Sequence, residues 1–366
     1  MFAAAFASGL TFSHTGEAQV RVGVAGPITG ASAAAGAELV QGVTQAAEDI
    51  NNAGGILGQK IELELGDDAS DPKQGVSVAG KFVADKVKFA IGHFNSGVTI
   101  PASDVYTENG IVMITPASTN PMVTDRRRWN VFRICGRDDQ QARLWAEYAR
   151  DRHKDEKIAI VHDKTTYGEG LAKAAREAMH EIGVTEVLYA GVNAGEKDYS
   201  AIVSRIKASA ARYVMWGGLE TEGGLIVRQM RDRGMSTVMI SGDGIAGSEF
   251  AVVGGPGVEG TLMSFGSDPR ANPDAKAAVE ALRSKGFEPE GYTLYSYAAM
   301  QIIKLAAERA QSLDPERVAS IMRSGLTFNT VIGDIAFDNK GDRTSADYVW
   351  YVWKKQPDGR IVFKPM

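Results

Sequence analysis

The sequence predicts an α/β protein made of two doubly wound parallel sheets. Segments with the apolar patterns of strands and helices alternate along most of the 366 residues, and this alternation restarts near residue 139. Repeated strand–helix units give parallel strands with helices on both faces of a sheet. A chain of this length suits two domains. No low-complexity run or long linker separates the two series, so we expect several short crossovers between the domains.

The first series alternates strands with helices. We expect strands at 20–25, 61–65, 89–92 and 111–114, and helices at 37–53, from Pro72 onward and at 100–109. The first helix has one apolar face, formed by Leu39, Val43, Ala46 and Ile50. Gly54 and Gly55 follow it, and glycine readily takes the left-handed conformation in which many helices end.

The second series repeats the pattern, and a mixed region follows it. We expect helices at 139–152, 171–182, 200–209 and 222–233, and strands at 158–161, 187–189, 213–216 and 238–241. The last third predicts helices at 272–284, 292–310 and 314–322, then strand-like segments at 332–337 and 348–353. In the helix at 171–182, Leu171, Ala175, Ala178 and Ile182 recur at the spacing of one helix face.

Charge and cysteine content exclude several classes of protein. The net charge of −5 argues against nucleic acid or an anionic membrane surface as the main partner. The single cysteine, Cys135, excludes an intrachain disulfide and a cysteine-based zinc cluster. The five histidines are scattered without metal-ligand spacing, so we expect no metal site.

The N-terminus predicts export. Residues 2–12 are apolar and small, and 16–18 is an acceptable cleavage site, but no Lys or Arg precedes Arg21. We therefore expect residues 1–18 to be a signal peptide that is incomplete or starts at the wrong codon. A plain tail and a membrane anchor are the alternatives.

Two glycine motifs resemble nucleotide-binding loops, and neither fits its expected context. Residues 242–247 match GxGxxG, but they close a series instead of opening the first unit, and Asp243 would face a pyrophosphate. Residues 75–81 match GxxxxGK, but they lie inside a helix and Phe82 replaces the magnesium-binding hydroxyl. We expect no cofactor and no catalytic activity. Cys135 is expected to be a small buried hydrophobe, and 126–128 a solvated turn or a partner contact.

Small polar residues follow several of the predicted strands, where ligands bind in open α/β sheets. They lie at 94–96, 115–119, 162–167 and 242–244. Hydroxyls, a phenol and one carboxylate suit a small zwitterion. The hydroxyls and backbone amides would bind its carboxylate, and Asp243 would bind its ammonium. Each residue taken alone is better explained as a cap or turn.

Ordered stretches along the chain resemble the periplasmic leucine/isoleucine/valine-binding proteins, the type I solute-binding components of ABC importers. They are DINNAGGILGQK (49–60), GDDASDPKQ (66–74), IGHFNSG (91–97), PASDVY (101–106), TPASTNP (115–121), IVHDKTTYGEG (160–170), AGEKDYSA (194–201) and YSYAAMQ (295–301). GHFNSG together with SGDG is similar to the branch that takes small neutral amino acids and γ-aminobutyrate.

The resemblance implies two doubly wound lobes joined by three crossovers and closing on a ligand. We expect one lobe at 19–137 plus 267–346 and the other at 138–266 plus 347–366. It implies a periplasmic monomer that captures a small amino acid for an ABC permease in the inner membrane. A sensor that presents the ligand to a membrane receptor, and a binder of an aromatic acid, remain alternatives.

The resemblance also assigns roles to single residues. On the first lobe, Ser96 and Thr119 would donate to the ligand carboxylate, and the carbonyl of Ala117 would accept from the ammonium. On the second lobe, Tyr167 and Asp243 would engage on closure, with Asp243 as the ammonium counter-ion. We also expect ligand contacts from Asn95, Leu219 and Gly244.

The sequence departs from the family pattern around this site. Asp243 stands where the family has Glu, which retracts the carboxylate by roughly 1.5 Å. Phe94 and Tyr292 would fill space that a leucine side chain needs, which favours short α-amino acids or γ-aminobutyrate. Ala35 replaces a bulky aromatic residue and opens volume, so branched side chains remain possible. Ser70 and Asn95 occupy the positions of the family's disulfide, which is therefore absent.

Overall fold

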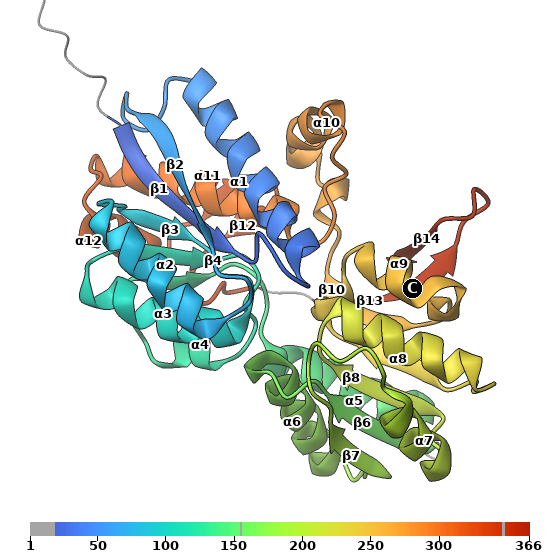
Figure 1. Cartoon of the computed structure of the whole chain (residues 1–366). Coiled ribbons are helices and arrows are strands. Elements are labelled where there is room, and N and C mark those ends of the chain that lie inside the picture. The colour runs from blue at the N-terminus through green and yellow to red at the C-terminus, as the bar shows by residue number, and fades with distance from the viewer. Residues whose placement is uncertain (1–18, 154–155, 346–347) are drawn as a thin grey trace, which may run out of the picture.

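The computed structural model describes residues 19–153, 156–345 and 348–366, and it divides them between two lobes (Figure 1). The expected signal peptide, 1–18, lies outside the described residues. Blue, cyan and orange segments form one lobe, so the N-terminal third and part of the C-terminal third lie together. None of the described helices is long and apolar enough to cross a membrane.

The first lobe is built on a five-stranded parallel sheet with the order β2-β1-β3-β4-β5. Its strands are β1 (Gln19–Gly26), β2 (Lys60–Asp67), β3 (Phe89–Ile91), β4 (Val112–Thr115) and β5 (Val131–Arg133). One face carries α1 (Ala33–Asn52), α10 (Lys276–Ser284), α11 (Thr293–Ala310) and α12 (Pro315–Met322). The other carries α2 (Pro72–Ala84), α3 (Ser96–Glu108) and α4 (Met122–Asp125). A two-stranded ribbon, β11 (Phe328–Thr330) and β12 (Gly333–Ile335), follows α12.

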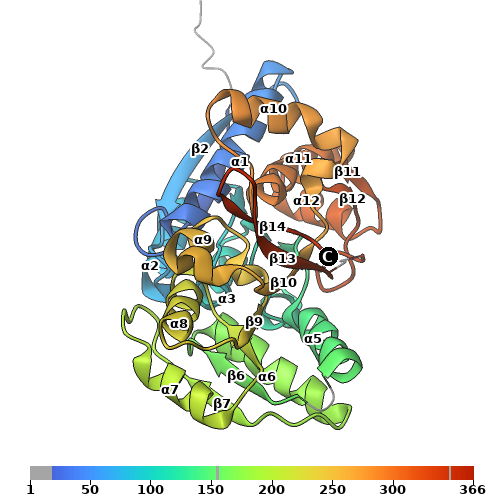
Figure 2. The same cartoon turned by 90° about the vertical axis from the view of Figure 1, so that its right-hand side faces the viewer.

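The second lobe is built on a seven-stranded sheet with the order β14-β13-β10-β9-β8-β6-β7. Its parallel strands are β6 (Ile158–His162), β7 (Leu188–Gly191), β8 (Tyr213–Gly217), β9 (Val238–Ser241) and β10 (Leu262–Gly266). An antiparallel hairpin, β13 (Tyr348–Lys355) and β14 (Ile361–Pro365), completes it. Figure 2 shows β14, β13, β10 and β9 following one another down the view.

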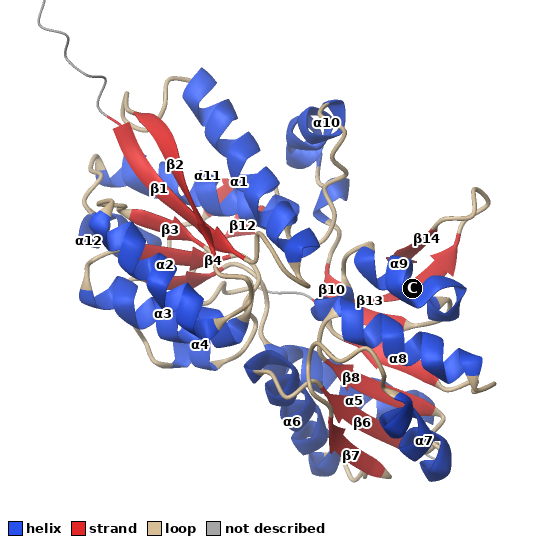
Figure 3. Cartoon of the chain, in the orientation of Figure 1, coloured by secondary structure: helices blue, strands red, loops and turns tan. Residues whose placement is uncertain are grey.

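Helices cover both faces of the second sheet (Figure 3). They are α5 (Asp138–His153) and α6 (Thr166–Glu181) on one face, and α7 (Ser200–Ser209), α8 (Glu220–Asp232) and α9 (Glu249–Gly254) on the other. Successive residues of a strand enter different cores: Ile160 packs with α5 and α6, whereas Val161 packs with the opposite face. Strands buried on both faces are apolar throughout, which explains the short apolar runs of the sequence.

Four observed strands, β5, β10, β11 and β14, were not predicted from the sequence. β5 has only three residues and contains Arg133. Several helices begin earlier than expected, among them α1, which begins at Ala33 and not at 37. α3 begins at Ser96 and α6 at Thr166, four and five residues before the predicted starts. Their first turns contain the polar residues of the ligand-facing loops, so the apolar period begins only one turn later. These early starts bring both helix N-termini to the cleft.

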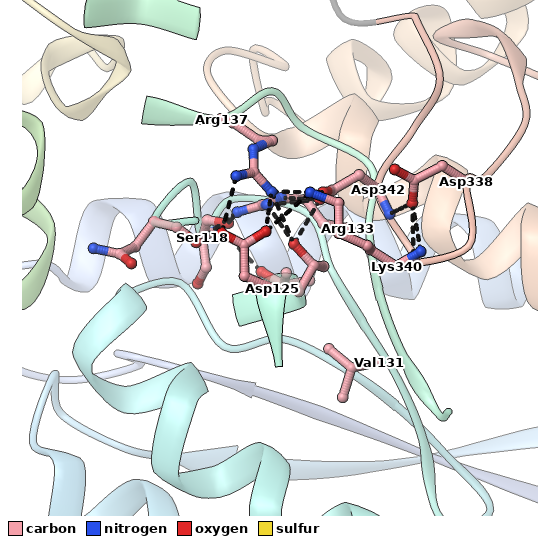
Figure 4. A network of polar contacts seen from close by, with 12 residues as sticks. Ser118, Asp125, Val131, Arg133, Arg137, Asp338, Lys340 and Asp342 are labelled. Atoms are coloured by element: carbon pink, nitrogen blue, oxygen red, sulfur yellow. Dashed lines mark hydrogen bonds and ion pairs between the residues drawn. The ribbon is translucent and has the colours of Figure 1, made fainter. Parts of the chain in front are cut away.

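A polar network ties two crossovers to the first lobe (Figure 4). Arg133 at the end of β5 is fully buried and donates to Asp342 Oδ1 from Nε at 2.9 Å and from Nη2 at 2.6 Å. Arg137, just before α5, donates to the other oxygen, Oδ2, at 2.7 Å. Asp125 joins the network through ion pairs with Arg137 at 3.0 Å and Lys340 at 2.9 Å. The two segments by which the chain leaves the first lobe, one after β5 and one before β13, are therefore fixed to each other.

The turn at 126–128 is only partly solvated. Arg126 is half-buried and donates from Nη1 to both oxygens of Asp104, at 2.8 and 2.9 Å. Arg128 reaches the same carboxylate at 2.8 Å, while Arg127 is exposed. The turn is thus fastened to α3, and this contact explains two of its three arginines.

Candidate functional site

Two adjoining chambers, which share several lining residues, lie between the lobes. The first chamber has a volume of about 240 Å³ and is lined from one lobe by residues around the start of α3, including Ser96 and Ala117. The other lobe contributes the start of α6, including Tyr167, and the turn after β9, including Asp243. The second chamber has a volume of about 280 Å³ and extends from the first toward the start of α1.

The structure brings most of the predicted residues to this cleft. Ser96, Ala117, Tyr167 and Asp243 line the first chamber only; Phe94, Asn95, Leu219 and Gly244 line both; Ala35 lines the second. Thr119 and Tyr292 are buried and line neither chamber. Their expected direct contacts with a ligand stay predictions, and both residues lie behind the wall.

The loop that precedes α3 is held by hydroxyl groups. Thr115 Oγ1 donates to the carbonyl of His93 at 2.9 Å, and Ser118 Oγ donates to that of Phe94 at 2.9 Å. The amides of Val98 and Thr99 donate to the backbone carbonyl of Asn95. The side chain of Asn95 makes no capping hydrogen bond to the helix. Helix N-termini leave their first amides unpaired, and these amides bind anions. The amides of Ser96 and Gly97 therefore form a ready site for a carboxylate.

Beneath this loop lies a buried polar group. His93 Nδ1 lies 2.6 Å from Asp68 Oδ2, and its Nε2 lies 3.1 Å from the Tyr106 hydroxyl. All three side chains are fully buried. Fully satisfied buried polar groups fix one arrangement, so this group holds the floor of the loop in place.

The turn after β9 presents one fixed carboxylate. Asp243 Oδ2 accepts from the Tyr292 hydroxyl at 2.5 Å, and Oδ1 accepts from Gln141 Nε2 and, at 3.4 Å, from Tyr167. Burial raises the pKa of Asp243, and the hydrogen bonds from Tyr292 and Gln141 offset only part of that rise. Burial also raises the pKa of Tyr167 and Tyr292, so both phenols remain donors. A cation beside Asp243 would stabilise its charged form.

A second buried acid stands behind the first. Asp138 begins α5 and is fully buried, and its amide donates to the Thr119 carbonyl at 3.0 Å. Burial and the charge of Asp243 raise the pKa of Asp138 well above its ordinary value. Asp138 Oδ2 and Thr119 Oγ1 have no hydrogen-bond partner among the described residues. With the carboxyl groups of Asp138 and Asp243 close together, the second-lobe wall of the first chamber favours a positively charged group.

Direct contacts between the lobes border the first chamber. Asn120 Nδ2 donates to the carbonyl of Thr166 at 3.0 Å, which joins the loop after β4 to the start of α6. The hydrogen bond from Tyr292 to Asp243 joins the start of α11 to the turn after β9. The ring of Tyr292 also meets Phe94 edge to face, with centroids 6.1 Å apart. These contacts join the two lobes next to the chamber.

Sequence reasoning missed Gln141 and did not place Ser70 in the site. Gln141 lies in a predicted helix, and no local signal distinguishes it from a surface glutamine. It is fully buried, and its Oε1 accepts from the Asp243 amide at 3.2 Å and from Ser264 Oγ at 2.8 Å. Ser70, noticed only as a disulfide position, lines both chambers.

The glycine motifs serve packing. Residues 75–81 lie within α2, as expected, and not in a phosphate loop. A Cβ on Gly244 would lie 2.6 Å from the carbonyl of Gly218 and 2.8 Å from Tyr167, so close contact requires glycine there. Cys135 is buried, which raises the pKa of its thiol. Within the described ranges, no group of three or more His, Cys, Asp or Glu residues could hold a metal ion.

Known proteins resemble the chain along almost its whole length. Residues 19–359 match the family model described as periplasmic binding protein. The chain is 53% identical over 356 residues to the Leu/Ile/Val-binding protein homolog 1 of Brucella melitensis, covering 97% of this chain and 96% of that protein. It is 50% identical to an amino acid binding protein of Pseudomonas aeruginosa, covering 96% and 95%. The crystal structure of a leucine binding protein from Thermotoga maritima superposes with a TM-score of 0.85 at 30% identity, covering 94% and 97%.

Proposed function

Since the chain belongs to the family of periplasmic binding proteins, we propose that it captures a small neutral amino acid between its lobes for delivery to an ABC permease. The observation that carries this proposal is a pair of opposed charge sites on the two lobes. The start of α3 offers free amides on one side, and the turn after β9 offers the Asp243 carboxylate on the other. A zwitterion has the two complementary charges.

The carboxylate of the ligand would lie at the start of α3. There the Ser96 hydroxyl and the amides of Ser96 and Gly97 donate, and the positive end of the helix dipole adds attraction. Ser96 Oγ already accepts from the amide of Asn120 at 3.3 Å, and its own proton would be donated to the ligand. The ligand would bind this lobe first.

The ammonium of the ligand would lie against Asp243. Its carboxylate is held by Gln141, Tyr167 and Tyr292, so it loses little freedom when a cation arrives. The Ala117 carbonyl would accept a second hydrogen bond. A pre-oriented counter-ion in a closed site discriminates strongly against ligands that have no ammonium.

The walls favour a short or branched side chain. Phe94 lines both chambers and is backed by Tyr292, which narrows the space beside the ammonium. Ala35 leaves the second chamber open. We therefore propose alanine, valine, leucine, isoleucine or the longer zwitterion γ-aminobutyrate as ligands. The same proposal includes export of the protein, with cleavage of the signal peptide before residue 19, and transfer of the ligand to a permease in the inner membrane.

Isothermal titration of purified protein, stripped of ligand by unfolding and refolding, tests the proposal. We expect micromolar binding, about −8 kcal/mol, of at least one of these amino acids. The panel also holds benzoate and the decarboxylated amine of valine. Binding of benzoate alone, or equal binding of valine and its amine, would contradict the zwitterion site.

A further inference from the structure

The second chamber has an acidic wall that a short neutral side chain does not use. Among the described residues lining it are the carboxylates of Asp163, Glu220 and Glu222, and no Lys, Arg or His. Asp163 follows β6, while Glu220 and Glu222 lie in the first turn of α8. The opposite wall holds Ala31 and Ser32, just before α1.

Asp163 has an acceptor oxygen for which the described residues supply no partner. Its side chain is 2% exposed, and Oδ1 accepts from the amide and hydroxyl of Thr165, at 2.9 and 2.6 Å. Oδ2 is buried and has no hydrogen-bond partner among the described residues. An unpaired buried acceptor costs free energy. Burial raises the pKa of Asp163 to about 6, and the charge of Glu222 adds to the rise.

The neighbouring acids strengthen the demand for positive charge. Glu222 is 6% exposed, and its Oε1 accepts from a neutral donor, the amide of Gly195, at 2.8 Å. Burial raises the pKa of Glu220 to about 8, and the charge of Glu290 contributes. Burial raises the pKa of Glu38 of α1 well above its ordinary value, and the charge of Glu220 adds to this rise. Burial is the largest cause of each rise, so these acids lack the positive partner that would stabilise their charged forms, and a bound cation would supply it.

The N-terminus of α1 places a partial positive charge opposite these carboxylates, but it is too small to neutralise them. A helix N-terminus carries about half a positive charge, which falls off within a turn. It faces three carboxylates on the other lobe. No described group of three such side chains is arranged to hold a metal ion, so the wall suits an organic cation that forms separate hydrogen bonds.

We infer that the second chamber binds the terminal cation of a basic amino acid, so that ornithine, lysine or arginine belongs to the ligand class. The inference rests on the proposed function, because the α-carboxylate and α-ammonium must occupy the first chamber. The side chain then passes Ser70 and Asn95, which line both chambers and carry buried polar atoms without partners among the described residues. The ammonium or guanidinium reaches Asp163 and Glu222.

Ornithine and norleucine provide the test, because they differ only by an ammonium in place of a methyl group. By isothermal titration, we expect the protein to bind ornithine about tenfold more tightly than norleucine, as a charge-assisted hydrogen bond predicts. Norleucine binding as tightly as ornithine would overturn the inference. Valine reports on the first chamber: if valine and every other amino acid fail to bind, the proposed function itself fails.

Isosteric variants locate the cation. Asp163→Asn keeps the acceptor for Thr165, and Glu222→Gln keeps the acceptor for Gly195. In each variant we expect ornithine to lose about tenfold more affinity than valine. Glu177→Gln removes an exposed charge on α6 and should change neither affinity. Equal losses for both ligands would show a structural role for these acids and overturn the assignment.

Discussion

The hydroxyl of Tyr292 donates to Asp243 Oδ2 at 2.5 Å, across the boundary between the two lobes. Tyr292 immediately precedes α11, which packs on α1 in the first lobe, whereas Asp243 follows β9 in the second. The proposed ammonium site therefore depends on closure, since one of its supporting donors comes from the opposite lobe. Binding of the cation and approach of the lobes are linked through this hydrogen bond.

Tyr292→Phe removes this donor and keeps the ring. The ring retains its contacts with Phe94 and Phe265, whose centroids lie 6.1 and 5.3 Å away. We expect valine to bind about tenfold more weakly, because one hydrogen bond to a charged group is lost. Tyr297→Phe is the control: its hydroxyl bonds Asp49 at 2.8 Å, away from both chambers. Equal affinities of the two variants would contradict the linkage.

Asp243→Ala removes the proposed counter-ion. We expect a loss of more than about 100-fold in affinity for an amino acid, because a buried ammonium without its partner costs about 3–5 kcal/mol. Calorimetry measures the affinity, and thermal unfolding shows whether the variant is folded. An unchanged dissociation constant would remove Asp243 from the site.

Asp342→Asn tests the crossover network. It leaves the buried guanidinium of Arg133 without its charged partner, so we expect the free energy of unfolding at pH 7 to fall by about 3 kcal/mol. Urea denaturation measures this loss. Asp358→Asn breaks an exposed pair with Arg360 and should be neutral.

The same variant should alter the acid dependence of stability. Burial raises the pKa of Asp342, but the charge and hydrogen bonds of Arg133 outweigh burial and lower it below 3.8. A lowered folded pKa gives stability that is present above the unfolded value and lost as the pH falls through the folded value. Between pH 4 and the folded pKa, the wild type should lose stability more steeply than Asp342→Asn. Parallel curves from urea denaturation would contradict this assignment.

Gly244→Ala tests the packing role of the glycine motif. Its Cβ would meet Gly218 and Tyr167, so the turn must move and carry Asp243 with it. We expect weaker amino acid binding. Gly80→Ala is the matched control, because nothing lies within 4 Å of the added Cβ and the helix α2 should gain about 0.5–1 kcal/mol. Unchanged binding by Gly244→Ala would show that the turn tolerates the methyl group.

The sequence by itself determined the α/β class, the two-lobed type I fold and the family, which are confirmed. Apolar periodicity and the residues at strand ends are local patterns, so they can be recognised in the sequence without the tertiary structure. The lobe boundaries and ligand contacts remain predictions. Asp243 and Ser96 could be chosen because each follows a predicted strand.

Only the tertiary structure decided which groups meet. Gln141 lies 102 positions from Asp243, and its role is invisible in a helix pattern. The bonds of Arg133 to Asp342 and of Tyr292 to Asp243 likewise join distant parts of the chain. The unpaired Oδ2 of Asp163 and the acidic wall around it depend on how α8 faces the loop after β6. Burial and pairing are properties of the folded surroundings, so no local spacing could have shown them.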